Sequence, residues 1–170
     1  MVPSLVPPDV PLQGPGGETM SFARPGGKLT LATIGYVSCP DLCPTTLSDW
    51  HRIRVHLGAD SSRVRFVFVS GDWRADTPAG SADFARRFDP SFIGVLSDSS
   101  SLPALLAAFQ ADAGYDRLPG GRGYRFGHTA LSYLLDEAGR IVLWYPFSSD
   151  PGFVARDIRR LLRERGLRRG

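Results

Sequence analysis

Runs of apolar and β-branched residues, each followed by a helical pattern of apolar positions, constrain the fold of this 170-residue chain most strongly. Such runs predict buried strands, and apolar residues at helical spacing predict helices that cover them. The predicted strands cover residues 28–36, 64–70, 92–96, 128–136 and 140–145, and the predicted helices begin near residues 43, 78, 101 and 153. Because strands alternate with helices, we expect an α/β protein whose central sheet is covered on both faces. The last two strands form a hairpin, which makes the sheet mixed.

Two segments lie outside this pattern. Residues 1–27 are rich in Pro and Gly, which predicts an extended leader or tether with a short strand at residues 20–22. Residues 113–127 are rich in Gly and Arg and too polar for a core, so we expect a loop there. The remaining length suits a single domain, residues 28–170, with a core of its own.

The only two cysteines follow the first predicted strand, in the sequence Cys39-Pro40-Asp41-Leu42-Cys43-Pro44. If a helix opens at Leu42 or Cys43, Cys43 occupies its first turn and Cys39 the loop just before it, so the two sulfurs can converge. The carboxyl end of a strand is where open α/β sheets place their sites, and this arrangement is that of a thioredoxin-like fold. The start of a helix also lowers the pKa of a nearby thiol.

Two adjacent thiolates form either a soft metal site or a redox pair. Three residues separate Cys39 from Cys43, whereas thioredoxin-type redox motifs have two. The wider loop favours two sulfurs that bracket an ion, and it leaves a redox dithiol as the alternative. A purely structural disulfide is disfavoured, because closing so short a loop gains little stability.

A metal site needs at least one more ligand, and the chain has three histidines, His51, His56 and His128. His51 and His56 fall on the helix after the cysteine motif and are most simply exposed polar positions. His128 starts an apolar strand after the Gly-rich segment, from where it could lie over the cysteine loop. Two thiolates and one imidazole suit Cu(I), and also Cu(II) if an oxygen ligand is added. Zinc competes, but structural zinc sites usually have four protein ligands.

Residues 35–47, Gly-Tyr-Val-Ser-Cys-Pro-Asp-Leu-Cys-Pro-Thr-Thr-Leu, resemble the signature of the Sco/SenC family. That family comprises thioredoxin-fold copper-binding proteins that help to assemble the copper centre of cytochrome c oxidase. Residues 70–78 resemble the family's Ser-Val-Asp-Pro-Glu-Arg-Asp-Thr-Pro stretch, residues 92–94 its third strand, and residues 128–136 the segment with its histidine ligand. The resemblance covers roughly residues 28–165, and the cysteine motif together with the distant histidine makes it specific.

The resemblance implies that Cys39, Cys43 and His128 bind copper, as Cu(I) or Cu(II), and that the cysteine pair is reducible. It implies a metallochaperone that hands copper to the copper-carrying subunit of the oxidase, and other copper chaperones are further candidate partners. The alternative is a thiol–disulfide oxidoreductase that keeps the cysteines of an oxidase subunit reduced, so the sequence leaves open whether the protein is an enzyme. The resemblance also implies an extracytoplasmic domain, periplasmic or on the outer face of the cell membrane, held by a tether whose anchor is not in this sequence.

The chain departs from the family pattern in the second motif, where Trp73-Arg74-Ala75 replaces Pro-Glu-Arg, while Asp72 and Asp76 are kept. Asp72, at the end of the second strand, resembles a family acid that affects copper handling and the redox state of the cysteines. A carboxylate in this place can also simply cap its loop. Trp73 is either a packed anchor of the loop or an exposed aromatic side chain that recognises a partner. These departures concern the choice of partner more than the metal site.

The charge of the chain argues against one class of partner. A formal net charge of +3 over 170 residues gives no reason to expect nucleic acid. The basic stretch 156–169 is typical of a solvated helix face, with contact to an anionic membrane surface as the alternative. No apolar run reaches the ~18 residues that a membrane-spanning helix needs, so we expect membrane anchoring only through the tether.

Overall fold

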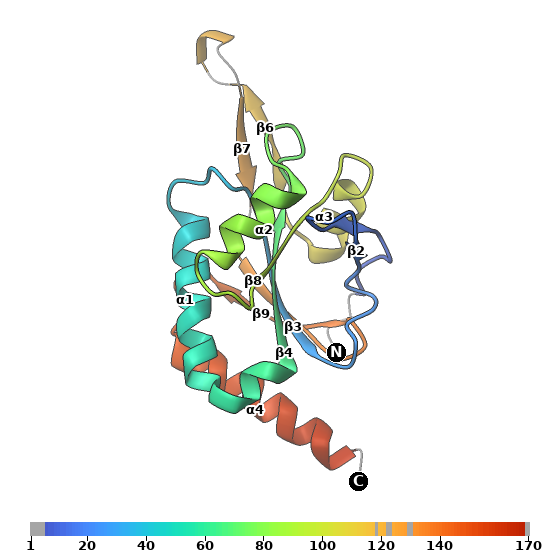
Figure 1. Cartoon of the computed structure of the whole chain (residues 1–170), viewed down its shortest axis with the longest axis vertical. Helices are drawn as coiled ribbons and strands as arrows, with labels where there is room; N and C mark the ends of the chain where they lie inside the picture. Colours follow the sequence, from blue (N-terminus) through green and yellow to red (C-terminus); the bar gives the residue numbers. More distant parts are fainter. Residues whose placement is uncertain (1–5, 118, 122–123, 129–130, 169–170) are drawn as a thin grey trace.

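The alternating strand and helix patterns fold into a seven-stranded mixed sheet with helices on both faces (Figure 1). The computed structural model describes residues 6–117, 119–121, 124–128 and 131–168. Within them, the large sheet has the order β2-β1-β5-β4-β3-β8-β9. Its strands are β1 (Leu12–Gln13), β2 (Thr19–Met20), β3 (Leu29–Gly35), β4 (Val64–Ser70), β5 (Ile93–Leu96), β8 (Leu131–Leu135) and β9 (Ile141–Pro146). The helices are α1 (Leu42–Leu57), α2 (Pro78–Arg86), α3 (Leu102–Phe109) and α4 (Pro151–Arg168), with short 3-10 helices η1 (Gly58–Arg63) and η2 (Pro119–Gly121).

The centre of the sheet is formed by the parallel strands β3, β4 and β5. β3 pairs with β4 along its whole length, from Leu29 opposite Val64 to Gly35 opposite Ser70. On its other edge β3 pairs antiparallel with β8, and β8 pairs antiparallel with β9. Every residue of β3 is buried, because helices or the N-terminal segment cover both of its faces. The mixed sheet of a thioredoxin-like fold is therefore confirmed.

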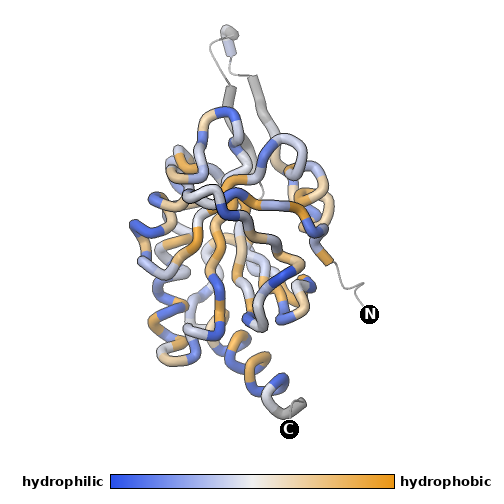
Figure 2. The backbone as a smooth tube through the Cα atoms, turned by 45° about the vertical axis from the view of Figure 1, so that its right-hand side comes forward, coloured by the Kyte–Doolittle hydropathy of each residue, from blue (hydrophilic) through white to orange (hydrophobic). Residues whose placement is uncertain are grey.

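Two apolar layers hold the sheet in place. Leu31 and Phe66 point to the face covered by α1, α2 and α4, whereas Ala32 and Val67 point to the face covered by α3 and the N-terminal segment. Figure 2 shows the apolar residues concentrated in the central strands, while the helices alternate between apolar and polar. This alternation is the helical periodicity that the sequence showed.

The largest side chain of the core anchors α1 to the sheet. Trp50 is 2% exposed and packs against Phe66 and Phe92, with ring centroids 6.0 Å away in each case. Its indole N–H donates a hydrogen bond to the hydroxyl of Ser132 on β8, 3.0 Å away. Because Trp50 lies two turns after Cys43 on the same buried side of α1, it also helps to position the helix end that carries this cysteine.

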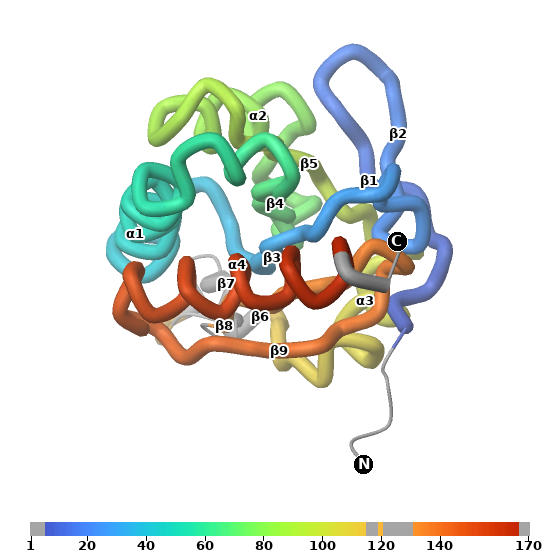
Figure 3. The backbone as a smooth tube through the Cα atoms, turned by 90° about the horizontal axis from the view of Figure 1, so that it is seen from below, coloured from blue at the N-terminus to red at the C-terminus, as the bar shows by residue number. Residues whose placement is uncertain are grey.

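The second half of the segment predicted as a leader packs on the sheet. β1 pairs with β2 and meets β5 at Gln13 opposite Leu96, so the two short strands extend the edge of the sheet that lies farthest from β9 (Figure 3). Leu12 and Phe22 are buried, and the Phe22 ring packs against Phe109 of α3 at 5.3 Å. The short strand expected at residues 20–22 lies at 19–20 instead. The division into a leader 1–27 and a domain 28–170 stays a prediction.

The prediction of a loop over residues 113–127 is wrong. β6 (Ala113–Arg117) and β7 (Tyr124–His128) form a two-stranded antiparallel sheet that projects from one end of the molecule (Figure 1). The strand predicted from 128 to 136 is divided accordingly, because His128 ends β7 and β8 begins at Leu131. Polarity misled the prediction: antiparallel strands pair through their backbone groups, so polar side chains do not prevent the pairing.

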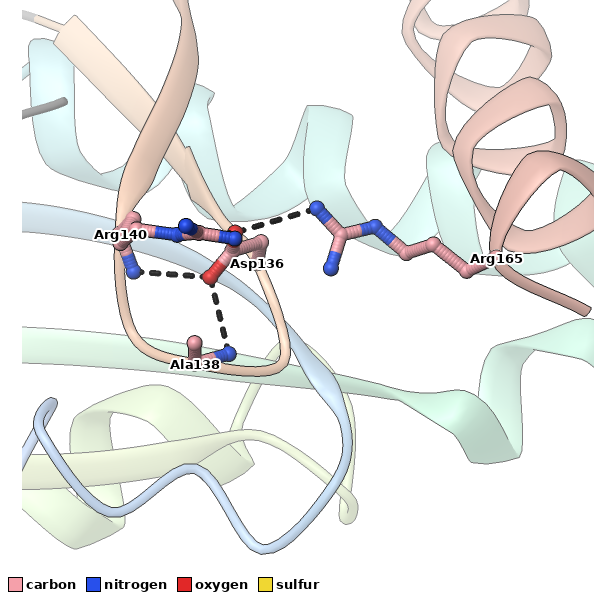
Figure 4. Close-up of polar contacts among 4 residues, drawn as sticks. All are labelled: Asp136, Ala138, Arg140 and Arg165. Atoms are coloured by element: carbon pink, nitrogen blue, oxygen red, sulfur yellow. Dashed lines mark hydrogen bonds and ion pairs between the residues drawn. The ribbon is translucent and has the colours of Figure 1, made fainter. Parts of the chain in front are cut away.

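A buried carboxylate joins the β8–β9 turn to α4 (Figure 4). Asp136 is fully buried and accepts hydrogen bonds from the backbone N–H groups of Ala138 and Arg140, at 2.8 and 2.9 Å. The guanidinium groups of Arg140 and Arg165 also donate to it, at 2.8 and 3.1 Å. Burial acts to raise the pKa of Asp136, but these hydrogen bonds outweigh it and hold the pKa below its usual value.

We expect Asp136→Ala to lower the free energy of unfolding by about 2–4 kcal/mol at pH 7, because it leaves buried donors without an acceptor. A carboxylate with a depressed folded-state pKa stabilises the protein above its unfolded-state pKa of about 3.9, and this stabilisation is lost as pH falls further. The difference from wild type, measured by urea unfolding, should therefore shrink below about pH 4. Asp83→Ala, at an exposed position of α2, is the control and should change stability little. Equal stability of Asp136→Ala and wild type at pH 7 would contradict this role.

Candidate metal centre

The two cysteines lie where the sequence placed them, at the junction between β3 and α1. α1 begins at Leu42, so Cys43 is in its first turn and Cys39 in the preceding loop. The backbone N–H of Cys43 donates to the sulfur of Cys39, 3.4 Å away. The side chains are 6% exposed for Cys39 and 2% exposed for Cys43, and no disulfide joins them. Two soft donor atoms are therefore close together at the carboxyl edge of the sheet.

Burial, and not the helix start, dominates the chemistry of the inner thiol. Burial raises the pKa of Cys43 strongly, and interactions with the side chains of Cys39 and Asp76 raise it further. A backbone hydrogen bond involving Tyr36 acts in the opposite direction but does not compensate. The expectation that the helix start would favour the thiolate is therefore wrong for Cys43 in the metal-free protein. A metal ion that binds this sulfur has to displace its proton.

Asp76, to which the sequence assigned no role, connects the cysteine loop to the sheet through hydrogen bonds. The Oδ2 atom of Asp76 accepts hydrogen bonds from the backbone N–H of Val37, at 2.8 Å, and from the hydroxyl of Ser70, at 2.5 Å. Beside it, the N–H of Gly71 donates to the carbonyl of Gly35, at 2.9 Å. The loop after β3 is thus joined to the loop after β4. The sequence did contain a signal for Asp76: this residue lies between the end of a predicted strand and the start of a predicted helix at Pro78.

Asp72 lies in the same loop and is 3% exposed. Its backbone N–H donates to the hydroxyl of Ser70, at 3.2 Å, and its carbonyl accepts from the N–H groups of Ala75 and Asp76. The loop with Asp72 and the loop with Cys39 start at the same edge of the sheet, because β3 and β4 are parallel. Its neighbour Trp73 is 37% exposed, with the guanidinium of Arg74 5.0 Å from its ring centre. Trp73 is thus neither a fully packed anchor nor fully exposed.

The three histidines differ in position. His51 and His56 are exposed on α1, as expected, and Nδ1 of His51 contacts the carboxylate of Asp89 at 3.0 Å. The backbone of His128 pairs with Ala113 at the end of β7, and its side chain lies outside the described residues. Figure 1 shows the β6–β7 hairpin leaving the molecule at the same end as the loop before α1. Among the side chains that the structure describes, no group of three Cys, His, Asp or Glu residues converges on a metal position.

The chain belongs to the SCO1/SenC family, whose model matches residues 11–163. The SCO2-like protein of Rickettsia conorii is 28% identical over 146 residues, which cover 84% of this chain and 70% of that protein. The copper-bound structure of Bradyrhizobium japonicum ScoI is 30% identical with a TM-score of 0.80, covering 91% of this chain and 98% of that one. The fold is also that of BsSco, a member of the Sco family of cytochrome c oxidase assembly proteins in which a disulfide switch was identified. BsSco is 21% identical with a TM-score of 0.69, and the match covers 92% of this chain and 93% of BsSco.

The part of the chain that the structure describes contains no helix with the length and apolar character of a membrane span.

Proposed function

We propose that this protein binds copper through Cys39, Cys43 and His128 and delivers it to the copper-carrying subunit of cytochrome c oxidase. The observation that carries the proposal is the buried cysteine pair, with the Cys43 N–H on the Cys39 sulfur at 3.4 Å. Two sulfur donors in a largely water-excluded place suit a soft ion such as Cu(I). Membership of the SCO1/SenC family and the copper found in B. japonicum ScoI support copper as the cargo.

His128 would supply the third donor from the β6–β7 hairpin. The backbone of β7 ends at this residue, so the ligand would come from an element that projects beyond the sheet. Two ligands on a rigid strand–helix junction and one on a projecting hairpin would allow stepwise transfer, because the hairpin ligand could leave while both sulfurs still hold the ion. Asp72, buried beside the cysteine loop, would shape the surroundings of the site without binding the ion.

The second candidate is a thiol–disulfide reductase that acts on an oxidase subunit. The two unbridged thiols of unequal exposure favour it. Cys39 would attack the target disulfide, one target thiol would leave, and Cys43 would displace the second while a Cys39–Cys43 disulfide forms. Two electrons pass to the target, so an external dithiol must reduce the pair again. The buried, protonated Cys43 would slow the second step, which makes this candidate the weaker one.

The proposed function places the domain outside the cytoplasm, attached to a membrane by a tether. It rests on the family, since the extracytoplasmic face is where an oxidase subunit would receive its copper. Other copper chaperones are proposed as donors of the ion.

We expect His128→Ala to shift or weaken the sulfur-to-Cu(II) charge-transfer band and to weaken copper binding at least about tenfold, since a direct ligand is worth no less than the groups that orient it. The measurement is an aerobic Cu(II) titration followed by absorption, with an anaerobic Cu(I) competition titration beside it. His56→Ala, at an exposed histidine on α1, is the matched control and should behave like wild type. An unchanged band in His128→Ala would exclude the imidazole as a ligand.

The same variant separates the two candidate functions. Turnover of a disulfide substrate should be measured in wild type and in His128→Ala with a dithiol as the reductant. If wild type turns over and binds no copper, the reductase replaces the metallochaperone. If the variant loses copper and wild type shows no turnover, the metal-transfer function stands alone.

A further inference from the structure

The loop that carries Cys39 is fixed at one point by a side chain from another part of the chain. Cys39 follows Val37 by two residues, and its own N–H donates to the carbonyl of Tyr36 at 3.3 Å, so residues 36–39 form a tight turn. The N–H of Val37, inside this turn, points to Oδ2 of Asp76, 2.8 Å away. Asp76 is 39 residues further along the chain, which makes this contact a long-range link.

The other partner of Asp76 is rigid. The same Oδ2 accepts the hydroxyl hydrogen of Ser70, at 2.5 Å, and Ser70 is fully buried at the end of β4. The Ser70 oxygen in turn accepts the N–H of Asp72, at 3.2 Å, and the N–H of Asp76 donates to the Asp72 carbonyl, at 2.8 Å. The Asp76 carboxylate is therefore fixed by the turn 72–76 and by Ser70 at the end of β4, independently of its contact with Val37.

We propose that Asp76 is a positioning residue that fixes the Val37 end of the cysteine loop against β4 and thereby sets the place of the Cys39 sulfur relative to Cys43. This inference rests on the proposed copper function. Cys43 is fixed independently, since it belongs to the first turn of α1. Of the two sulfurs, only that of Cys39 depends on the conformation of a loop, and a displacement of ligands by about 1 Å is enough to impair a metal site.

Two substitutions distinguish placement from charge. Asp76→Asn keeps an oxygen at the same distance from the backbone, and an amide oxygen can accept two hydrogen bonds, although the charge is lost. Asp76→Glu keeps the charge but moves the oxygens outward by one methylene group. Asp76→Ala removes both. If the position of the acceptor oxygen matters, Asp76→Ala should have the largest effect, Asp76→Glu a smaller one, and Asp76→Asn should behave almost like wild type.

The test combines a readout on the metal-free protein with one on the copper-loaded protein. In the metal-free protein, the rate at which Cys39 reacts with iodoacetamide is measured by mass spectrometry. We expect it to rise about tenfold in Asp76→Ala and moderately in Asp76→Glu, and to stay within about threefold of wild type in Asp76→Asn. In the copper-loaded protein, the sulfur-to-Cu(II) band should shift or weaken in the same order, with affinity reduced about 10–100-fold for Asp76→Ala.

The outcomes separate this inference from the copper function. Wild-type reactivity of Cys39 in Asp76→Ala, or an Asn variant that behaves like Ala while Glu behaves like wild type, overturns the positioning role. If wild type binds no copper, the proposed function fails, and the alkylation order still decides the role of Asp76. If Asp76→Ala does not fold, the comparison of Asn with Glu decides it, and Asp83→Ala controls for loss of an acidic side chain.

Discussion

Replacing both cysteines by serine, Cys39→Ser with Cys43→Ser, should reduce the affinity for Cu(I) by about 100-fold or more. Serine hydroxyls are nearly isosteric with thiols but are hard, weakly coordinating donors that do not ionise at neutral pH. The loss should exceed the tenfold to 100-fold effects typical of residues that only orient ligands. The measurement is an anaerobic competition titration against a Cu(I) chelator of known affinity.

The chain offers a matched control for this experiment. Its only other sulfur atoms belong to two methionines, and Met20 lies on β2 at the far edge of the sheet from β9. Met20→Leu removes a soft sulfur of the thioether type and should leave the copper affinity unchanged. Copper bound to the double serine variant as tightly as to wild type would end the proposed function, provided that circular dichroism shows both to be folded.

Trp50→Ala should produce the largest loss of stability, about 3–5 kcal/mol, as is typical for an aromatic side chain removed from a core. The indole is 2% exposed, packs on Phe66 and Phe92, and donates to Ser132 on β8. In a protein of this size the loss corresponds to a decrease in Tm on the order of 10 °C. Differential scanning calorimetry of the metal-free protein measures it directly.

Two further variants make this prediction specific. Trp50→Phe keeps most of the packing and loses the hydrogen bond to Ser132, so it should cost less than the Ala variant. Val55→Ala, on the same helix at a residue that is 64% exposed, should change stability by less than about 0.5 kcal/mol. A surface substitution changes Tm by at most roughly 2 °C. If the Tm of Trp50→Ala lies within that range of wild type, the core tolerates the cavity and this prediction is wrong.

The parts of the fold that the sequence predicted well are those in which burial is strongest. β3 and β4 are buried along almost their whole length, so apolar and β-branched residues dominate their sequences. The cysteine motif was placed correctly because a strand end and a helix start are both marked locally, the latter by Pro44. The start of α2 is marked locally too, because Thr77 precedes Pro78 and its hydroxyl accepts the N–H of Gly80 at 3.0 Å.

The parts that were missed depend on contacts between distant segments. β6 and β7 pair with each other in a sheet of their own, and their polar sequences carry no signal of a buried strand. β1 joins the large sheet through a single pair with β5 across more than eighty residues, which no local pattern reveals. Asp76 was visible only as part of a motif, because its role depends on a backbone N–H of Val37, and a backbone donor leaves no trace in the sequence. The pKa of Cys43 was misjudged for a related reason, since the degree of burial depends on the whole fold.

The packing of β1 and Phe22 onto the sheet limits the distance between the domain and any point of attachment on its N-terminal side. A flexible spacer extends by at most about 3.5 Å per residue, and 27 such residues would span about 95 Å. The stretch from Leu12 to Phe22 is held against β5 and α3 and adds nothing to that reach. A spacer on that side therefore ends before β1 and not at residue 27, whatever its own length.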